Sequence, residues 1–149
     1  MRRSLLTLMF AVCWASLAYA QMTPEKVRAA VQQYGGAENF VRAMASNFAK
    51  MAGQMLDDQT KMTAAAAIGK SLVYYIQLVN YEKSSIQNTN EFRRQVAERN
   101  ARAVCTSPTS SVLINEFEVD FKYIAYSKSN EYLFEYAFNK TTCAPDYRW

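Results

Sequence analysis

The chain has 149 residues, with 17 Lys and Arg, 13 Asp and Glu, and no histidine. This length fits one domain with one hydrophobic core. The lack of histidine excludes the Ser-His-Asp and Cys-His catalytic constellations and removes the commonest zinc ligand. The four glycines form no phosphate-binding motif. Carboxylates with Lys, Tyr or Ser are the groups that remain for catalysis.

Residues 1–20 have the features of an export signal. An apolar run covers Leu5 to Trp14 after two arginines, and Ala18-Tyr19-Ala20 places small residues where a signal peptidase cleaves. The run is roughly ten to fifteen residues long, short of the ~20 that a membrane span needs. We therefore predict cleavage before Gln21, a single mature domain over residues 21–149 and a periplasmic or secreted location.

The predicted cleavage also changes the charge. Without the two arginines of the signal, 15 basic residues face 13 acidic ones, and the formal net charge falls from +4 to +2. The sequence pI of about 9.0 therefore belongs partly to the signal. We expect neither nucleic-acid binding nor a membrane span in the mature chain.

Two cysteines remain after cleavage, because Cys13 leaves with the signal. Cys105 and Cys143 then lie in a compartment that permits disulfides, 38 residues apart. A pair of reactive thiols is the alternative, but the chain has no Cys-x-x-Cys motif and no histidine that could lower a thiol pKa. We predict one structural disulfide between them.

The segment from residue 21 to residue 104 is predicted to be helical. Thr23-Pro24 suits the start of a helix and Gly35-Gly36 suits its end. Apolar residues from Val41 to Met55 recur at intervals of three and four, which indicates one stripe of a second helix. The predicted helices cover residues 24–34, 37–56, 59–81 and 88–104.

The third predicted helix, residues 59–81, is the most apolar part of the mature chain. It carries Ala64 to Ile68 and then a run of Leu, Val, Tyr and Ile, so we expect it at the centre of the core. Met44, Met51 and Met55 of the preceding stripe could bind soft Cu(I), but their neighbours are apolar and we interpret them as core residues. We predict no metal and no cofactor.

The pattern changes after Cys105. Thr106 to Ser111 is predicted to be a polar turn containing Pro108, and the residues that follow alternate with period two. The predicted hairpin consists of a strand over residues 116–123, a turn at residues 127–130 and a strand over residues 132–138. The fold class is therefore α+β, with three to four helices packed on one face of a small antiparallel β-hairpin sheet. The disulfide closes the open end of this hairpin.

The predicted hairpin carries a face of carboxylates. Alternation places Glu116, Glu118 and Asp120 on one strand face, at intervals of about 6.5 to 7 Å, with Glu135 across from them. Such a face is solvated, paired with arginines of the preceding helix, or used to bind a protein. Paired acids also serve glycosidases and metal sites, but an outer hairpin face offers no cleft that would raise a carboxyl pKa. We take these four residues as the candidate binding face and predict no catalytic residue.

The aromatic content offers a second candidate surface. The chain has ten tyrosines, and Tyr147-Arg148-Trp149 ends it. Aromatic side chains together with arginine are the usual anchors of protein interfaces. Packing in the core and at its rim is the alternative role for these side chains.

Together these patterns favour a non-enzymatic periplasmic protein that binds another exported or envelope protein. An inhibitor or immunity protein against an envelope-acting toxin or hydrolase is the form that we expect. One alternative is a small cell-envelope hydrolase that uses carboxylates. Another is a soluble carrier that holds an apolar ligand between the second and third predicted helices, which requires a cavity of several hundred Å³.

Overall fold

The computed structural model describes residues 22–149. The predicted signal therefore lies outside the described residues. Within the described part of the chain, no helix is both long and apolar enough to cross a membrane.

The first two helices form largely where the sequence predicts them. Helix α2 (Pro24–Gln33) begins after Thr23, whose hydroxyl accepts a hydrogen bond from the Lys26 amide at 3.4 Å. It ends before Gly35, which adopts a φ of +75° that glycine takes without strain. Helix α3 (Ala37–Ala49) follows at once and is shorter than predicted, because the chain turns after Lys50.

The prediction of a central helix over residues 59–81 is wrong. This segment forms an antiparallel hairpin of β1 (Thr60–Ile68) and β2 (Ser71–Leu78), joined by Gly69 and Lys70. Gly69 has a φ of +57°, which permits the tight turn.

The run of alanines from Ala64 to Ala67 favoured the helix prediction, because alanine has the highest helix propensity of all residues. In the structure Ala65 and Ala67 instead pack against the core of the sheet, on the strand that α3 contacts most. Their small size lets the helix lie close to the sheet.

The predicted helix near residues 88–104 is confirmed as α4 (Thr89–Thr106), which follows the short 3-10 helix η1 (Lys83–Ser85). The predicted polar turn at residues 106–111 is wrong, because α5 (Pro108–Phe117) starts there. Proline in the first turn needs no amide hydrogen bond, so Pro108 begins this helix rather than a loop.

The first strand of the predicted hairpin begins later than expected. Glu118 caps α5 with a left-handed backbone, φ 57° and ψ 40°, so the chain turns where alternation predicted an extended strand. The hairpin itself is confirmed and consists of β3 (Asp120–Tyr126) and β4 (Tyr132–Phe138). A register irregularity between Ala125 and Tyr126 leaves Tyr132 48% exposed, while the later aromatic residues of β4 are buried.

The four strands form one sheet in the order β1-β2-β3-β4. The two hairpins are antiparallel, but β2 and β3 run parallel, so the sheet is mixed and not the purely antiparallel one predicted. Parallel neighbours need a long crossover, and the chain between them supplies it with α4 and α5.

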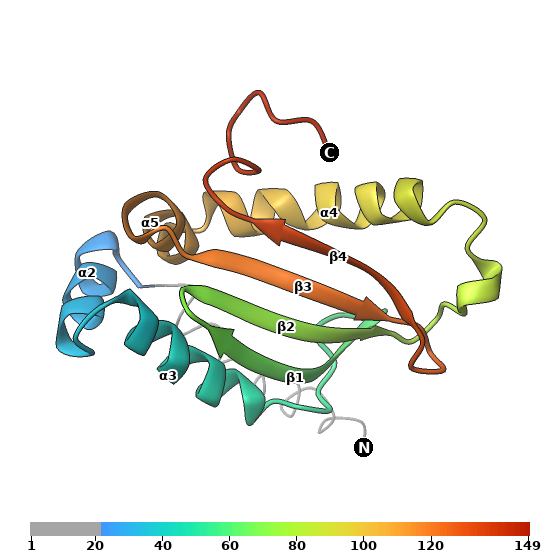
Figure 1. Ribbon diagram of the computed structural model, residues 1–149, viewed down its shortest axis with the longest axis horizontal. Helices are drawn as coiled ribbons and strands as arrows, with labels where there is room; N and C mark the ends of the chain where they lie inside the picture. The colour runs from blue at the N-terminus through green and yellow to red at the C-terminus, as the bar shows by residue number, and fades with distance from the viewer. Residues whose placement is uncertain (1–21) are drawn as a thin grey trace, which may run out of the picture.

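The elements are arranged as helices against a sheet, which confirms the α+β class. Figure 1 shows α3 along the β1 side of the sheet, α4 along the β4 side, and α2 and α5 together at one end. The predicted disulfide is also confirmed. Cys105 in the last turn of α4 bonds to Cys143 in the segment after β4, with a distance of 5.4 Å between the two Cα atoms.

Candidate functional site

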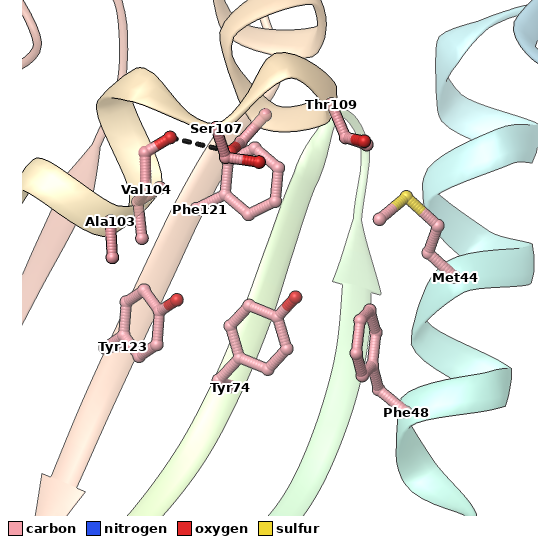
Figure 2. Close-up of a pocket in the computed structure, with 10 residues that line it drawn as sticks. Met44, Phe48, Tyr74, Ala103, Val104, Ser107, Thr109, Phe121 and Tyr123 are labelled. Carbon is pink, nitrogen blue, oxygen red and sulfur yellow. Dashed lines mark hydrogen bonds between the residues drawn. The ribbon is translucent and has the colours of Figure 1, made fainter. Parts of the chain in front are cut away.

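A pocket opens between α3 and α4 over the middle of the sheet. Helix α3 packs on β1 and β2, whereas α4 packs on β4. Tyr74 of β2 and Tyr123 of β3 lie between the two helices, and side chains of both helices surround them (Figure 2). We call this site the α3–α4 pocket. Its lining residues are Met44, Phe48, Tyr74, Ala103, Val104, Ser107, Thr109, Ser110, Phe121 and Tyr123.

The floor of the pocket belongs to a row of stacked rings. Strand pairing sets Tyr74 beside Tyr123, and Tyr123 beside Tyr136. The ring centroids of Tyr74 and Tyr123 are 5.0 Å apart, and those of Tyr123 and Tyr136 are 5.1 Å apart with planes only 6° from parallel. Phe48 of α3 meets Tyr74 edge to face at 5.3 Å. Such ring pairs add to the stability of the sheet, so the floor is preformed.

The pocket is small and uncharged. Its volume is about 220 Å³, below the 300–1,000 Å³ that is typical of small-molecule sites. None of its lining residues is charged. Two of the hydroxyls on its rim are engaged, since Ser110 Oγ donates to the Val104 carbonyl at 2.6 Å and Thr109 Oγ1 donates to the Met22 carbonyl at 3.5 Å.

The hydroxyl of Tyr74 is available to a ligand. Tyr74 is only 7% exposed, yet its hydroxyl forms no hydrogen bond with any residue between 22 and 149. Every fully enclosed side-chain nitrogen or oxygen in the described chain has a partner, so this oxygen must be reachable from the pocket. Figure 2 shows the hydroxyl pointing into the space below the α4–α5 junction. A ligand in the pocket can therefore form a hydrogen bond with this hydroxyl, which no residue between 22 and 149 supplies.

The surroundings keep these tyrosines protonated. Burial raises the pKa of Tyr74 well above its usual value, and the neighbouring Tyr123 adds a smaller effect. Burial likewise raises the pKa of Tyr123. Burial raises the pKa of Tyr136 to about 12, although a hydrogen bond from Asn100 Nδ2 at 3.0 Å to its hydroxyl acts in the opposite direction. At neutral pH the pocket therefore presents hydroxyl groups and no phenolate.

An alkaline titration should show this directly. Below pH 10 these tyrosines are protonated in the folded and the unfolded chain, and their contribution to stability is complete. Above pH 10 the unfolded chain ionises first, so stability falls, and for Tyr136 the loss extends to pH about 12. We expect phenolate absorbance to show Tyr74, Tyr123 and Tyr136 ionising above pH 10 or only on unfolding. Replacing each tyrosine by phenylalanine assigns the steps, and ionisation of Tyr74 near pH 10 in the folded protein would contradict the burial.

The four carboxylates of the predicted binding face do not lie on one strand. Glu116 is on α5, Glu118 is the cap of that helix, and only Asp120 and Glu135 belong to strands. Helical and left-handed backbone around Glu118 breaks the alternation that the sequence suggested.

Three of these carboxylates have basic partners, in each case from another element or strand. Arg28 donates from Nε and Nη2 to both oxygens of Glu116, at 2.7 and 2.6 Å. Glu118 lies 3.5 Å from Lys70, and Glu135 lies 2.9 Å from Lys122. The hydrogen bonds from Arg28 hold the pKa of Glu116 below its usual value. The paired arrangement is the ordinary one for solvated acids.

The metal site and the apolar-ligand carrier, both considered from the sequence, have no matching arrangement of side chains or helices in residues 22–149. No group of three or more Cys, Asp or Glu side chains there is arranged to hold a metal ion. The methionine stripe divides, because Met44 is buried in the core while Met55 is 49% exposed. The carrier alternative placed a ligand between two helices of which the second does not exist.

Sequence reasoning identified the tyrosines as a group but not the pocket. Tyr74 was assigned to a helix, so no strand partner could be inferred for it. Ala103, Val104 and Ser107 carry no local signal of a site, since small and apolar residues are common at any helix end. Ser107-Pro108 was the available clue, because it marks a helix start and hence a corner between two helices.

Comparison with known proteins gives similarity of fold only. No family model matches the chain, and no curated protein matches it in sequence. Solved structures do share its architecture. The pilotin EpsS of the Vibrio vulnificus type 2 secretion system has a TM-score of 0.58 at 8% identity, over 80% of this chain and 99% of the pilotin.

Two further solved structures also have a fold similar to that of this chain. The type II secretion system pilotin AspS of Vibrio cholerae has a TM-score of 0.56 at 10% identity, over 78% of this chain and 97% of that one. A Pseudomonas aeruginosa protein classed as secreted has a TM-score of 0.53 at 12% identity, over 72% of this chain and 96% of that one. At these identities the chain has the same fold as two type II secretion system pilotins and a protein classed as secreted.

Proposed function

We propose that this protein is exported, has no catalytic activity, and binds another protein of the cell envelope through the α3–α4 pocket. The observation that carries the proposal is the Tyr74 hydroxyl, which opens into an apolar pocket from a residue only 7% exposed and has no hydrogen-bond partner among residues 22–149. Anchor side chains of protein interfaces typically occupy well-packed pockets from which water is excluded.

The fold supports the same class of function. Two of the similar structures are pilotins of type II secretion systems, and the third is a protein classed as secreted. A partner in an export machine of the envelope is therefore the first to test. The narrower role of an inhibitor or immunity protein is a prediction from sequence, which identification of the partner will decide.

The two alternatives have weaker support. A carboxylate hydrolase needs two acids in one cleft, whereas Glu116, Glu118 and Glu135 each lie beside a basic side chain at the surface. A carrier of a lipid-sized ligand needs several hundred Å³, and the α3–α4 pocket has about 220 Å³.

Affinity capture with a pocket-filling variant tests the proposal. Ala103 lies at the exposed mouth of the pocket on α4, so Ala103→Trp should block the pocket without disturbing the core. We expect immobilised wild-type protein, with its disulfide intact, to retain an envelope protein that Ala103→Trp does not retain. The retained protein, once purified, should bind the wild type directly and the variant at least tenfold more weakly, as for loss of one anchor.

Ala29→Trp is the matched control. Ala29 is an exposed alanine on α2 and does not line the pocket, so its tryptophan variant should capture the partner as the wild type does. If no envelope protein is retained, the binding function is refuted. If Ala103→Trp retains the partner as well as Ala29→Trp does, the site is wrong.

A further inference from the structure

We infer that the α3–α4 pocket receives one tyrosine side chain of the partner protein, whose phenol hydroxyl bonds to the Tyr74 hydroxyl. This inference rests on the proposed function and adds the chemistry of the group that the pocket selects. Three properties of the pocket lead to it: its volume, its lack of charge and its unmet hydroxyl.

The volume fits a single ring. A cavity of about 150 Å³ lined by apolar side chains is known to hold benzene. The α3–α4 pocket has about 220 Å³, which leaves room for one ring with a hydroxyl and a methylene group. Phe48, Phe121 and the faces of the two tyrosines supply aromatic contacts on several sides (Figure 2). Rings prefer such offset and edge-to-face neighbours.

The lining excludes a charged occupant. The ten residues around the pocket carry no ionisable side chain other than the two tyrosines, and both have a raised pKa. A carboxylate, ammonium or guanidinium group would be buried there without a counter-charge, at a high cost in free energy. Aspartate, glutamate, lysine and arginine are therefore poor anchors for this site.

The unmet hydroxyl distinguishes tyrosine from the other apolar anchors. Leu, Ile and Phe would fill the volume but would leave the Tyr74 hydroxyl without a partner. A phenol both donates and accepts a hydrogen bond, whereas the indole of tryptophan only donates. The hydroxyls of Tyr74 and Tyr123 point in the same direction, toward the α4–α5 junction, where Ser107 also presents its side chain (Figure 2). An incoming phenol can therefore accept a hydrogen bond from the Tyr74 hydroxyl or donate one to it.

Side-chain analogues test the selectivity without knowledge of the partner. We expect p-cresol, the side chain of tyrosine, to bind the wild-type protein roughly fivefold more tightly than toluene, the side chain of phenylalanine, because of one added hydrogen bond. Backbone amide shifts in NMR titrations should map both ligands to Tyr74, Ala103 and Val104. Tyr74→Phe keeps the ring and removes the hydroxyl, so the ratio of the two affinities should fall close to one.

Controls separate this inference from the proposed function. Tyr132→Phe removes an exposed hydroxyl of β4 and should leave the ratio unchanged, while Ala103→Trp should abolish binding of both analogues. Equal affinity for p-cresol and toluene, or a preference that Tyr74→Phe retains, would overturn the tyrosine assignment even if Ala103→Trp still abolishes partner capture. If the protein prefers p-cresol but captures no envelope protein, the pocket selects a phenol, and binding to an envelope protein is refuted. With a captured partner, changing its contacting tyrosine to phenylalanine should weaken binding to the wild type about fivefold and to Tyr74→Phe hardly at all.

Discussion

Replacing both Cys105 and Cys143 by serine should lower the free energy of unfolding by about 4 kcal/mol. The bond closes a loop of 38 residues, and a crosslink of this span restricts the unfolded chain by that amount in the chain-entropy treatment. This is a large part of the 5–15 kcal/mol that typically stabilises a folded domain. Urea unfolding of the oxidised wild type and the double variant measures the difference.

The position of the bond predicts a second effect of this double substitution. Cys105 directly follows Ala103 and Val104, and its bond ties the end of α4 to the segment after β4. Without it, the corner between α4 and α5 should move more freely, and partner capture should weaken along with stability. Wild-type protein treated with a reductant is the control and should match the double variant. A double variant within about 1 kcal/mol of the oxidised wild type would show that the bond contributes little.

The second large effect is expected for Phe138→Ala. Phe138 is fully buried at the end of β4, and its ring lies 5.7 Å from that of Tyr123, 5.5 Å from that of Tyr136 and 5.2 Å from that of Trp149. Truncating a buried phenylalanine to alanine leaves a cavity and lowers the free energy of unfolding by about 3–5 kcal/mol. Urea unfolding measures this loss, and near-ultraviolet circular dichroism should report the loosened aromatic packing.

Tyr132→Ala, on the same strand, is the matched control. Tyr132 is 48% exposed, so its truncation should change the free energy of unfolding by about 0.5 kcal/mol or less. Equal costs for the two truncations would contradict the burial assigned to the two ends of β4. The comparison also tests the register irregularity between Ala125 and Tyr126, which leaves Tyr132 exposed.

Local sequence signals located several elements correctly. Thr23 and Asn88 cap their helices, and Asn88 accepts a hydrogen bond from the Glu91 amide at 3.1 Å. The strand alternation from Phe134 to Phe138 is likewise realised, with every second side chain buried. These features depend on residues within one or two turns of each other, so periodicity and capping rules suffice to find them.

Tertiary packing decided two elements that the sequence predicted wrongly. Residues 59–81 contain two largely apolar runs, residues 64–68 and 72–79, and such runs suit a buried helix and a buried strand equally well. Packing of α3 on β1 and pairing of β2 with β3 decide in favour of strands. At residues 106–111, polar composition suggested a turn, but burial of Val112, Leu113 and Ile114 stabilises a helix there.

The candidate site also depends on contacts between distant segments, which local sequence patterns do not indicate. Glu116, Glu118 and Asp120 alternate in sequence, yet Arg28 and Lys70 pair with the first two from distant segments. Conversely, nothing in the sequence near residue 74 indicates that residue 123 will lie beside it. The α3–α4 pocket draws on five elements, and its residues span positions 44 to 123.

The sequence by itself determined the starts of α2, α3 and α4, the hairpin at the end of the chain and the pair of cysteines that forms the disulfide. Each of these follows from local backbone preferences or from the small number of cysteines. Only the tertiary structure decided the parallel pairing of β2 with β3, the row of stacked tyrosines and the pocket above them. Contacts between distant segments form because the whole chain must bury its apolar surface at once, and no local pattern records which strand will lie beside which.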